Sequence, residues 1–224
     1  SENRVHNITK GALLIDGSIV PAGQTFSCND SLGVRSRENG WLPATAFANG
    51  GAETRQEYGG GICQISTTLY NAVLRSDLEI IARSGHTRKV RYIGGGLDAA
   101  LSGKDKDFVF RNNTDSDIYV FMWVDESQKT LCCEIYGCPF PSDFDRVDTV
   151  SELTSSTPPS EPQFVLDSAL EPGECVLKRK AIAGSTYQSY RVYSLNGEII
   201  RRVPIDKTEY PMHPALYAVG QGKS

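Results

Sequence analysis

Residues 58–70 read Tyr-Gly-Gly-Gly-Ile-Cys-Gln-Ile-Ser-Thr-Thr-Leu-Tyr, so three glycines lead directly into an amphipathic segment. Apolar residues then recur at helical spacing, namely Ile62, Ile65, Leu69, Ala72 and Val73. This spacing predicts a helix that begins after Gly61 and buries one face. Glycines accept positive φ and let the main chain approach a ligand closely, so Gly60 and Gly61 are predicted to contact substrate.

Cys63 stands beside the apolar stripe, at the predicted start of this helix. Unpaired N–H groups and the positive end of the helix dipole favour a thiolate there. A thiol with a pKa near ~8.5 is only slightly ionised at neutral pH, and a fall of about two units would make most of it nucleophilic. Free cysteines are usually small buried hydrophobes, but the glycine turn and the polar neighbours favour a reactive thiol.

A thiol nucleophile needs a base, and the chain contains three histidines, His6, His86 and His213. His86 is the best candidate, because residues 83–87 look like a turn entering a strand, from whose edge the ring could face Cys63. The imidazole could hold the thiolate and then shuttle protons. The alternative is a surface histidine at the start of a strand. Asp98 could orient the ring, and a turn-forming aspartate is an equal alternative.

Composition limits the class of protein. The 224 residues suffice for one large domain or two small ones, and the 39% hydrophobic content is ordinary. A net charge of −4 without a run of lysine or arginine argues against nucleic acid as a partner. No apolar stretch approaches the length of a membrane span. The chain begins with Ser1 and shows no signal peptide, so an export signal or membrane anchor could lie outside it.

The six cysteines are too few and too irregularly spaced for a disulfide scaffold. Cys132, Cys133 and Cys138 are close in sequence, but adjacent residues of a strand point to opposite sides, and no Cys-x-x-Cys pair or histidine lies near them. We therefore expect no metal site. A disulfide involving Cys138 is one possibility in an oxidising compartment, and buried free thiols are the other. A cysteine paired with a histidine is suited to acyl transfer, and this chemistry needs no cofactor, so none is expected.

The order of predicted elements indicates an α+β fold over residues 1–140, with the cysteine-bearing helix packed on an antiparallel sheet. Asp16-Gly17 predicts a tight hairpin within Leu13 to Val20, and Trp41 to Asn49 could form a short helix. Strands are expected at Leu78 to Ala82 and Thr87 to Ile93. A meander is expected from Asp107 to Arg111, Asp117 to Val124 and Thr130 to Tyr136.

Composition changes at Ser142, where Ser, Thr, Pro and acidic residues become dominant. Residues 141–162 are therefore predicted to be a linker or an entry strand. Residues 163–224 are predicted to form a smaller all-β module. Its expected strands are Cys175 to Ile182, Tyr187 to Ser194 and Glu198 to Val203, the last two joined by an Asn196-Gly197 turn.

Several of these motifs resemble the VanW domain, over about Ser1 to Gly137. The resemblance is carried by Asn3-Arg4, Asn7-Ile8, residues 21–27 (Pro-Ala-Gly-Gln-Thr-Phe-Ser), residues 59–71 from Gly-Gly-Gly-Ile-Cys-Gln onward, His86, Tyr92, Asp98-Ala99 and Asp107-Phe108. The remainder resembles a G5 domain, an elongated β module often appended to bacterial surface proteins. That second resemblance rests on Gly173, Gly184, Asn196-Gly197 and Val219-Gly220.

The VanW name implies no reaction by itself, but some members are described as peptidoglycan L,D-transpeptidases whose nucleophile matches Cys63. The resemblance therefore implies that Cys63 attacks a tetrapeptide stem, that D-alanine leaves, and that an amine of a neighbouring stem completes a 3–3 cross-link. His86 would move the protons. Main-chain N–H groups near Cys63, helped by Gln64, would stabilise the oxyanion. Ser66 and Thr67 could touch substrate or could equally support the first helical turn.

The resemblance also implies a substrate contact for Tyr92, peptidoglycan stem peptides as partners, and a location outside the cytoplasmic membrane, in the cell wall or anchored at the cell surface. Two alternatives stay open. Water could resolve the acyl-enzyme, which would make the protein a cell-wall cysteine peptidase. The glycine turn could instead grip a stem or glycan in a non-catalytic wall-binding module, in which case Cys63→Ala should retain binding.

Overall fold

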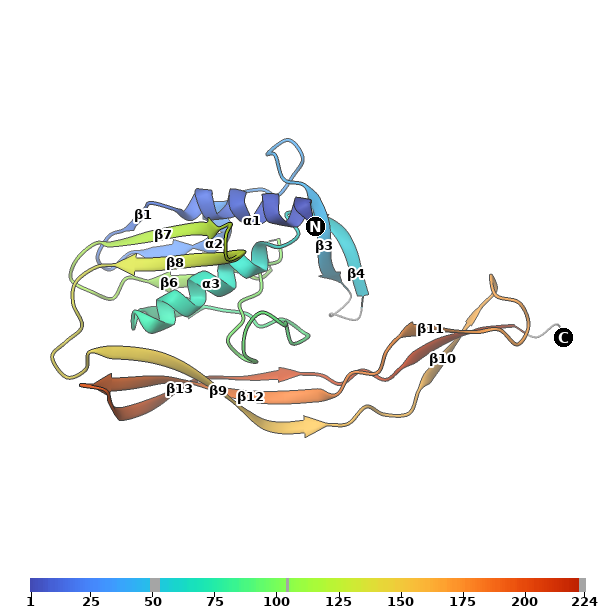
Figure 1. Cartoon of the computed structure of the whole chain (residues 1–224). Coiled ribbons are helices and arrows are strands. Elements are labelled where there is room, and N and C mark those ends of the chain that lie inside the picture. Colours follow the sequence, from blue (N-terminus) through green and yellow to red (C-terminus); the bar gives the residue numbers. More distant parts are fainter. Residues whose placement is uncertain (49–52, 104, 222–224) are drawn as a thin grey trace.

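The computed structural model describes residues 1–48, 53–103 and 105–221. Three helices belong to its first half: α1 (Glu2–Ile15), α2 (Cys28–Leu32) and α3 (Ile62–Arg75). Fourteen strands make up the rest of the regular structure, so the α+β class is confirmed in its broad form. The N-terminal part gathers above one three-stranded sheet of the C-terminal part, and a second sheet extends beyond it toward the C-terminus (Figure 1).

Three sheets belong to the N-terminal part. Their strand orders are β1 (Ser18–Val20), β7 (Ile118–Asp125) and β8 (Thr130–Tyr136) in the first, β2 (Thr25–Ser27), β6 (Val109–Arg111) and β5 (Glu79–Ala82) in the second, and β3 (Pro43–Ala48) with β4 (Glu53–Tyr58) in the third. All their pairings are antiparallel. The cysteine-bearing helix contacts the first sheet through β8 and the second through β5.

The core lies where α1 and α3 pack on one face of the first sheet. Buried side chains from all three form one cluster, which includes Ile15, Ile65, Leu69, Val120 and Met122. Each is less than 1% exposed, and complete burial of such a side chain is worth about 1.5–3 kcal/mol. This cluster fixes α3 at its back, so the start of the helix is held in place for chemistry.

Two predictions in the first fifty residues are wrong. Leu13 to Val20 is not a hairpin: α1 continues to Ile15, because its residues at helical spacing are buried, and β1 pairs with β7 far along the chain. Trp41 to Asn49 is not a helix, because Pro43–Ala48 finds a complete antiparallel partner in β4. That pairing outweighs the local preference of an alanine-containing segment. Asn49 itself lies outside the described residues.

The region after α3 also differs from expectation. Strand β5 agrees with the predicted strand at Leu78 to Ala82, but Thr87 to Ile93 forms no strand and runs as an irregular segment along a cleft. One contact of this segment is made by Lys89, whose Nζ donates to the Tyr187 hydroxyl at 2.8 Å. The β7–β8 hairpin is confirmed, but the predicted meander is not, because β6 pairs with β2 and β5.

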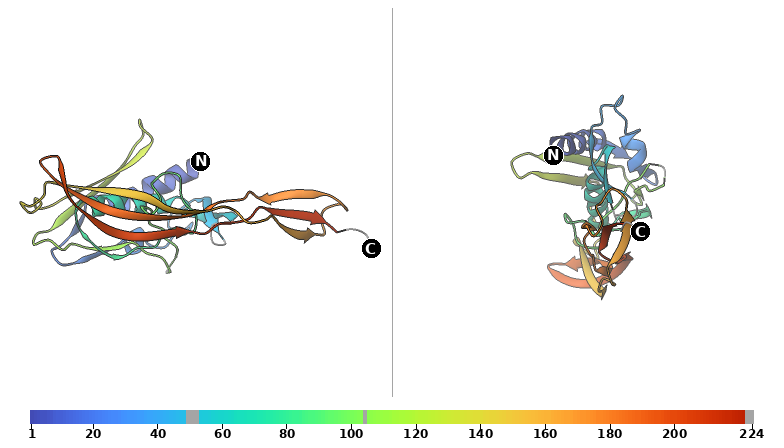
Figure 2. Two further views of the ribbon diagram at one scale, coloured as in Figure 1. Left: turned by 90° about the horizontal axis from the view of Figure 1, so that it is seen from below. Right: turned by 90° about the vertical axis from the view of Figure 1, so that its right-hand side faces the viewer.

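The C-terminal part is all-β and elongated, as the views in Figure 2 show. One sheet has the order β13 (Glu198–Tyr210), β12 (Gly184–Leu195) and β9 (Arg146–Thr157), and the other has β10 (Gln163–Asp167), β14 (Leu216–Gly220) and β11 (Cys175–Arg179). The predicted Asn196-Gly197 turn joins β12 to β13, with positive φ at both residues. Strand β9 occupies part of the segment expected to be a linker or entry strand.

The β12 strand docks against the C-terminal end of α3. Arg191 donates from Nε to the Leu74 carbonyl at 3.1 Å and also reaches the Leu78 carbonyl. The Tyr193 hydroxyl donates to Asp77 at 2.6 Å. Because the last carbonyls of a helix lack partners within it, the bond to Leu74 satisfies a carbonyl at the end of α3, and all three contacts tie the two parts together. Within the described ranges, no helix is long and apolar enough to cross a membrane.

Candidate active site

The glycine turn sets the position of Cys63, which is the second residue of α3. Gly61 precedes the helix with φ +114°, a backbone conformation that side chains other than glycine's rarely adopt. A Cβ on Gly60 would lie 2.4 Å from the Ala44 carbonyl oxygen, so that position also requires glycine. The side chain of Asn7 donates to the Gly60 carbonyl at 3.1 Å and holds the turn against α1.

The Cys63 sulfur lies beside a loop that crosses the start of α3. The main-chain N–H of Leu101 donates to Sγ over 3.4 Å. The loop is tied to the helix by Asn71, whose side chain donates to the Leu97 carbonyl at 2.8 Å, and by the Ser66 hydroxyl, which donates to the Ala99 carbonyl at 2.7 Å. These bonds hold the thiol and the loop that carries Asp98 in one fixed arrangement.

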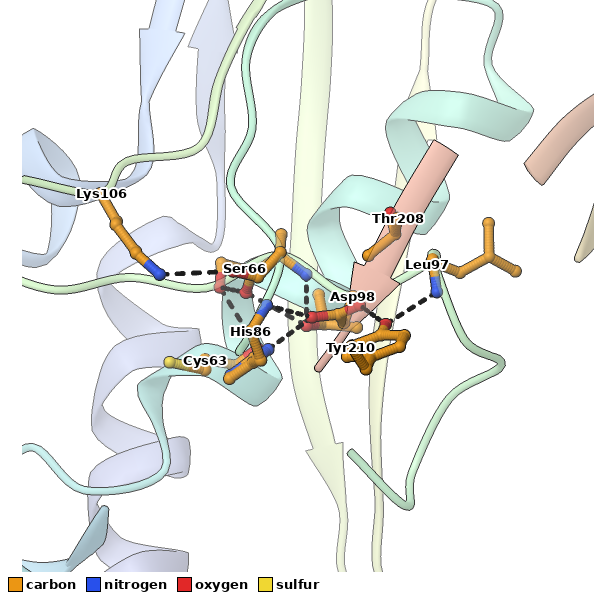
Figure 3. A network of polar contacts seen from close by, with 12 residues as sticks. Cys63, Ser66, His86, Leu97, Asp98, Lys106, Thr208 and Tyr210 are labelled. Carbon is orange, nitrogen blue, oxygen red and sulfur yellow. Dashed lines mark hydrogen bonds and ion pairs between the residues drawn. The ribbon is translucent and has the colours of Figure 1, made fainter. Parts of the chain in front are cut away.

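His86 and Asp98 form a close pair beside the sulfur (Figure 3). Nδ1 of His86 donates to Oδ2 of Asp98 at 2.6 Å, and the main-chain N–H of His86 donates to the same oxygen at 2.7 Å. The ring also makes a hydrogen bond with Cys63. Since Nδ1 is engaged by Asp98, Nε2 is the ring nitrogen available to the sulfur. The structure thus brings all three predicted catalytic residues together.

The Asp98 carboxylate is completely buried and is held from its other side. Oδ1 accepts a hydrogen bond from the Tyr210 hydroxyl at 2.5 Å and pairs with Arg83 Nη2 at 3.2 Å. Arg83 Nε also donates to the Asp98 carbonyl at 2.6 Å. A buried carboxylate stays charged only when such donors replace water, so this shell keeps Asp98 ionised.

The electrostatics of the three residues favour a thiolate–imidazolium pair. Burial opposes ionisation of Cys63, but the hydrogen bond and charge of His86, the Leu101 N–H and Arg4 together lower the pKa of the thiol. Burial likewise opposes the charge on His86, and the hydrogen bonds with Asp98 and Cys63 raise its pKa to about 9. The pKa of Asp98 falls to about 2, against the effect of burial, because His86 and Tyr210 donate to it.

Cys63 and His86 lie in the wall of a cleft of about 1800 Å³, between the β3–β4 hairpin and the irregular segment 86–92. The lining is strongly basic although the chain as a whole carries a net charge of −4. Seven basic side chains and two acidic ones line it, the basic set being Arg4, Arg35, Arg55, Arg88, Lys89, Arg91 and Lys106. The cleft therefore suits an anionic ligand.

The residues predicted to bind substrate divide into two groups. Gly60, Gly61 and Tyr92 line the cleft, and Tyr92 is 39% exposed. Ser66 and Thr67 are 0% and 2% exposed, and their hydroxyls are bonded to Ala99. That burial favours the alternative reading of these two residues, in which they support the helix and the loop.

Gln64 has a partner that the sequence reasoning did not single out. Arg4 of α1 donates from Nη2 to the Gln64 side-chain oxygen at 3.1 Å. Its charge helps to lower the pKa of Cys63. Arg83 and Tyr210 were also missed. Arg83 lies within residues 83–87, but nothing in the sequence pointed to a carboxylate partner, and Tyr210 lies 112 residues beyond Asp98.

All six cysteines are free thiols. Burial raises the pKa of Cys133 to about 12, and Cys28 is buried with a raised pKa as well, whereas Cys138 and Cys175 are exposed. In the described part of the chain, no group of three or more His, Cys, Asp or Glu side chains is arranged to hold a metal ion. Cys63 alone among these thiols combines a lowered pKa with an adjacent imidazole.

A family model described as VanW like protein matches residues 3–136. Two curated relatives are similar over the same region. The chain is 41% identical over 120 residues to "Uncharacterized protein YoaR" of Bacillus subtilis, covering 54% of this chain and 39% of that protein. It is 30% identical over 132 residues to "Vancomycin B-type resistance protein VanW" of Enterococcus faecalis, covering 57% and 47%. The alignments thus span less than half the length of either relative.

Two solved structures resemble part of the chain. The IgA1 protease G5 domain matches with 17% identity and a TM-score of 0.24, covering 34% of this chain and 92% of that one. The G5 domain of HP0197 matches with 16% identity and a TM-score of 0.19, covering 33% and 97%. Both matched structures are described as G5 domains.

Proposed function

Because this chain belongs to the VanW family, whose relatives include a vancomycin B-type resistance protein, we propose that it acts on peptidoglycan as a cysteine L,D-transpeptidase. The observation that carries the proposal is the continuous hydrogen-bonded series from Cys63 through His86 to Asp98 in the wall of an open cleft. A nucleophile, a base and a residue that orients the base are the parts that acyl transfer through a thioester requires.

The first half-reaction begins with the Cys63 thiolate. Sγ bonds to the carbonyl carbon that precedes the terminal D-alanine of a donor tetrapeptide, and the carbonyl electron pair moves to oxygen. The start of α3 and the paired Arg4 and Gln64 supply positive potential for that oxyanion. The oxyanion then collapses, the bond to D-alanine breaks, and His86 gives its proton to the departing amine. A thioester on Cys63 and neutral His86 result.

The second half-reaction regenerates the starting ion pair. An amine of a neighbouring stem attacks the thioester, and His86 takes the proton that this amine must lose. The carbon–sulfur bond breaks and Cys63 leaves as a thiolate beside the newly protonated ring. The new amide is the 3–3 cross-link. Asp98 keeps its charge throughout and stabilises the imidazolium of His86. One proton leaves with D-alanine and another is taken from the acceptor amine, so the proton count of the site is restored after each cycle.

The charge of the cleft supports a stem peptide as the substrate. A stem carries free carboxylates, including that of the terminal D-alanine, and the lining has seven basic and two acidic side chains. Arg4 reaches the start of α3, and Arg88 and Arg91, which follow His86 in the sequence, also line the cleft. Guanidinium groups bind carboxylates through paired N–H donors, so these arginines could hold a stem on both sides of the scissile bond.

The direct test incubates the full chain with disaccharide-tetrapeptide muropeptides and analyses the products by mass spectrometry. We expect cross-linked dimers that lack one D-alanine, and none with Cys63→Ala. Cys138→Ala, which removes an exposed thiol away from the cleft, serves as the matched control and should behave like the wild type. Shortened monomers without dimers would contradict transfer and favour a peptidase. Stem binding without any product, equal in wild type and Cys63→Ala, would contradict catalysis.

A further inference from the structure

The Asp98 carboxylate is held by a residue from the C-terminal part. Tyr210, the last residue of β13, reaches the loop of residues 96–98 (Figure 3). Its hydroxyl donates to Oδ1 of Asp98 at 2.5 Å and accepts from the main-chain N–H of Gly96 at 2.8 Å. Tyr210 is only 3% exposed, so the hydroxyl faces these groups and not water.

The same strand acts on Asp98 by a second route. Arg83, which pairs with Oδ1 of Asp98, donates from Nη1 to Asp206 at 2.8 Å and to the Thr208 hydroxyl at 3.0 Å. Asp206 and Thr208 both belong to β13. The strand therefore supplies one donor directly to Oδ1 and fixes the guanidinium that supplies another.

We propose that Tyr210 is a positioning residue of the active site, and that β13 of the C-terminal part completes the site that Cys63, His86 and Asp98 begin. This inference rests on the proposed function. The family model matches residues 3–136, so the match does not include Tyr210. The C-terminal module is then a component of the catalytic machinery and not just a spacer that carries the domain.

The physical role of Tyr210 follows from the two oxygens of the carboxylate. Oδ2 accepts both bonds from His86, and Oδ1 accepts from Tyr210 and Arg83. With both oxygens engaged, the carboxylate cannot rotate away from the ring. Without the hydroxyl, a fully buried carboxylate loses one of the donors that replace water, so it holds its charge less well, and Oδ1 is held by Arg83 alone.

The competing explanation is that Tyr210 only joins the two parts of the chain. The junction offers a matched comparison, because the Tyr193 hydroxyl of β12 donates to Asp77 at 2.6 Å in the same way. Asp77 lies after the C-terminal end of α3, at the opposite end from Cys63. Tyr193→Phe therefore removes an equivalent tyrosine–aspartate bond across the junction without touching Asp98.

The test compares Tyr210→Phe and Tyr193→Phe in the full chain by the pH dependence of iodoacetamide labelling at the Cys63 peptide. In Tyr210→Phe we expect the acid limb of the labelling rate to move up by about one pH unit. The reason is that an Asp98 carboxylate that is held less firmly and keeps its charge less well stabilises the imidazolium and the thiolate less. Turnover of tetrapeptide muropeptides should fall about tenfold with KM little changed, the usual worth of a hydrogen bond to a buried charge. Tyr193→Phe should keep the wild-type profile.

Labelling and turnover separate this inference from the proposed function. If the wild type labels with a low acid limb but forms no cross-links, the proposed transpeptidase function is contradicted, while a shift in Tyr210→Phe still supports the positioning role of Tyr210. An unchanged acid limb in Tyr210→Phe, or an equal shift in Tyr193→Phe, would contradict the positioning role. Should Tyr210→Phe fail to fold by circular dichroism, Thr208→Val tests the second route, with a smaller shift in the same direction expected and no shift contradicting the inference.

Discussion

Replacing Asp98 by Asn removes the charge that sustains the imidazolium while keeping the shape of the side chain. Burial alone would lower the pKa of His86 below its ordinary value of 6.5, yet the bonds with Asp98 and Cys63 raise it to about 9. The rise in pKa from 6.5 to about 9 corresponds to roughly 3 kcal/mol in favour of the protonated ring. The hydrogen bond with Asp98 is the largest single contact that raises the pKa, so we expect a large share of this energy to depend on the Asp98 charge.

In Asp98→Asn the pKa of His86 should therefore fall by more than about one unit, and the ring loses its proton near neutral pH. The thiolate loses its cationic partner at the same time. We expect turnover at neutral pH to fall by about tenfold to a hundredfold, with the acid limb of Cys63 labelling moved to higher pH. Labelling is followed on the Cys63 peptide by mass spectrometry, because the exposed thiols of Cys138 and Cys175 also react.

Asp77→Asn is the matched control, since Asp77 also accepts a tyrosine hydroxyl and lies 3.4 Å from Arg191, but at the far end of α3. It should leave the labelling profile unchanged. A wild-type profile in Asp98→Asn would refute the reasoning, because it would mean that the ionisation of Cys63 does not depend on the carboxylate behind the ring.

Three further predictions follow from named contacts. Arg4→Gln should lower kcat/KM for tetrapeptide muropeptides about tenfold and raise the pKa of Cys63, because it removes a charged donor beside the thiolate; unaltered kinetics and labelling would exclude that role. Acid should lower the free energy of unfolding through Asp98, whose pKa is about 2 in the folded protein against an ordinary 3.8. Its contribution of about 2 kcal/mol is complete above pH 3.8 and is lost as the pH falls through the folded-state pKa. Denaturant titrations should show this loss in the wild type and not in Asp98→Asn. Gly60→Ala should lower the free energy of unfolding by at least about 2 kcal/mol, since the new Cβ would meet the Ala44 carbonyl oxygen, and a wild-type melting curve would contradict the tight fit of this turn.

Local signals explain which parts of the fold could be predicted from sequence. The glycine run before Ile62–Arg75 and the Asn196-Gly197 turn each determine the conformation of only a few neighbouring residues. Their structures could therefore be predicted without knowledge of the rest of the chain. The Pro43–Ala48 strand could not be predicted in this way, because its conformation depends on pairing with β4. The pairing of β1 with β7 likewise joins residues about a hundred positions apart.

The same distinction applies to the candidate site. Cys63, His86 and Asp98 were predicted because each residue type has a known part in acyl transfer, and a search for a thiol, a base and a carboxylate finds them. Tyr210 has no such signature. A tyrosine in a β-strand is ordinary, and its importance appears only when β13 is seen against the loop of residues 96–98.

A covalent thioester at Cys63 is the central intermediate of the proposed reaction. Intact-protein and peptide mass spectrometry, after rapid acid quenching of the full chain with a tetrapeptide muropeptide and no acceptor in excess, measures this directly. We predict a mass increase equal to the donor less D-alanine, located on the Cys63 peptide and absent from Cys63→Ala. Cross-linked product formed without that adduct at any quench time, or an adduct on another residue, would contradict the account.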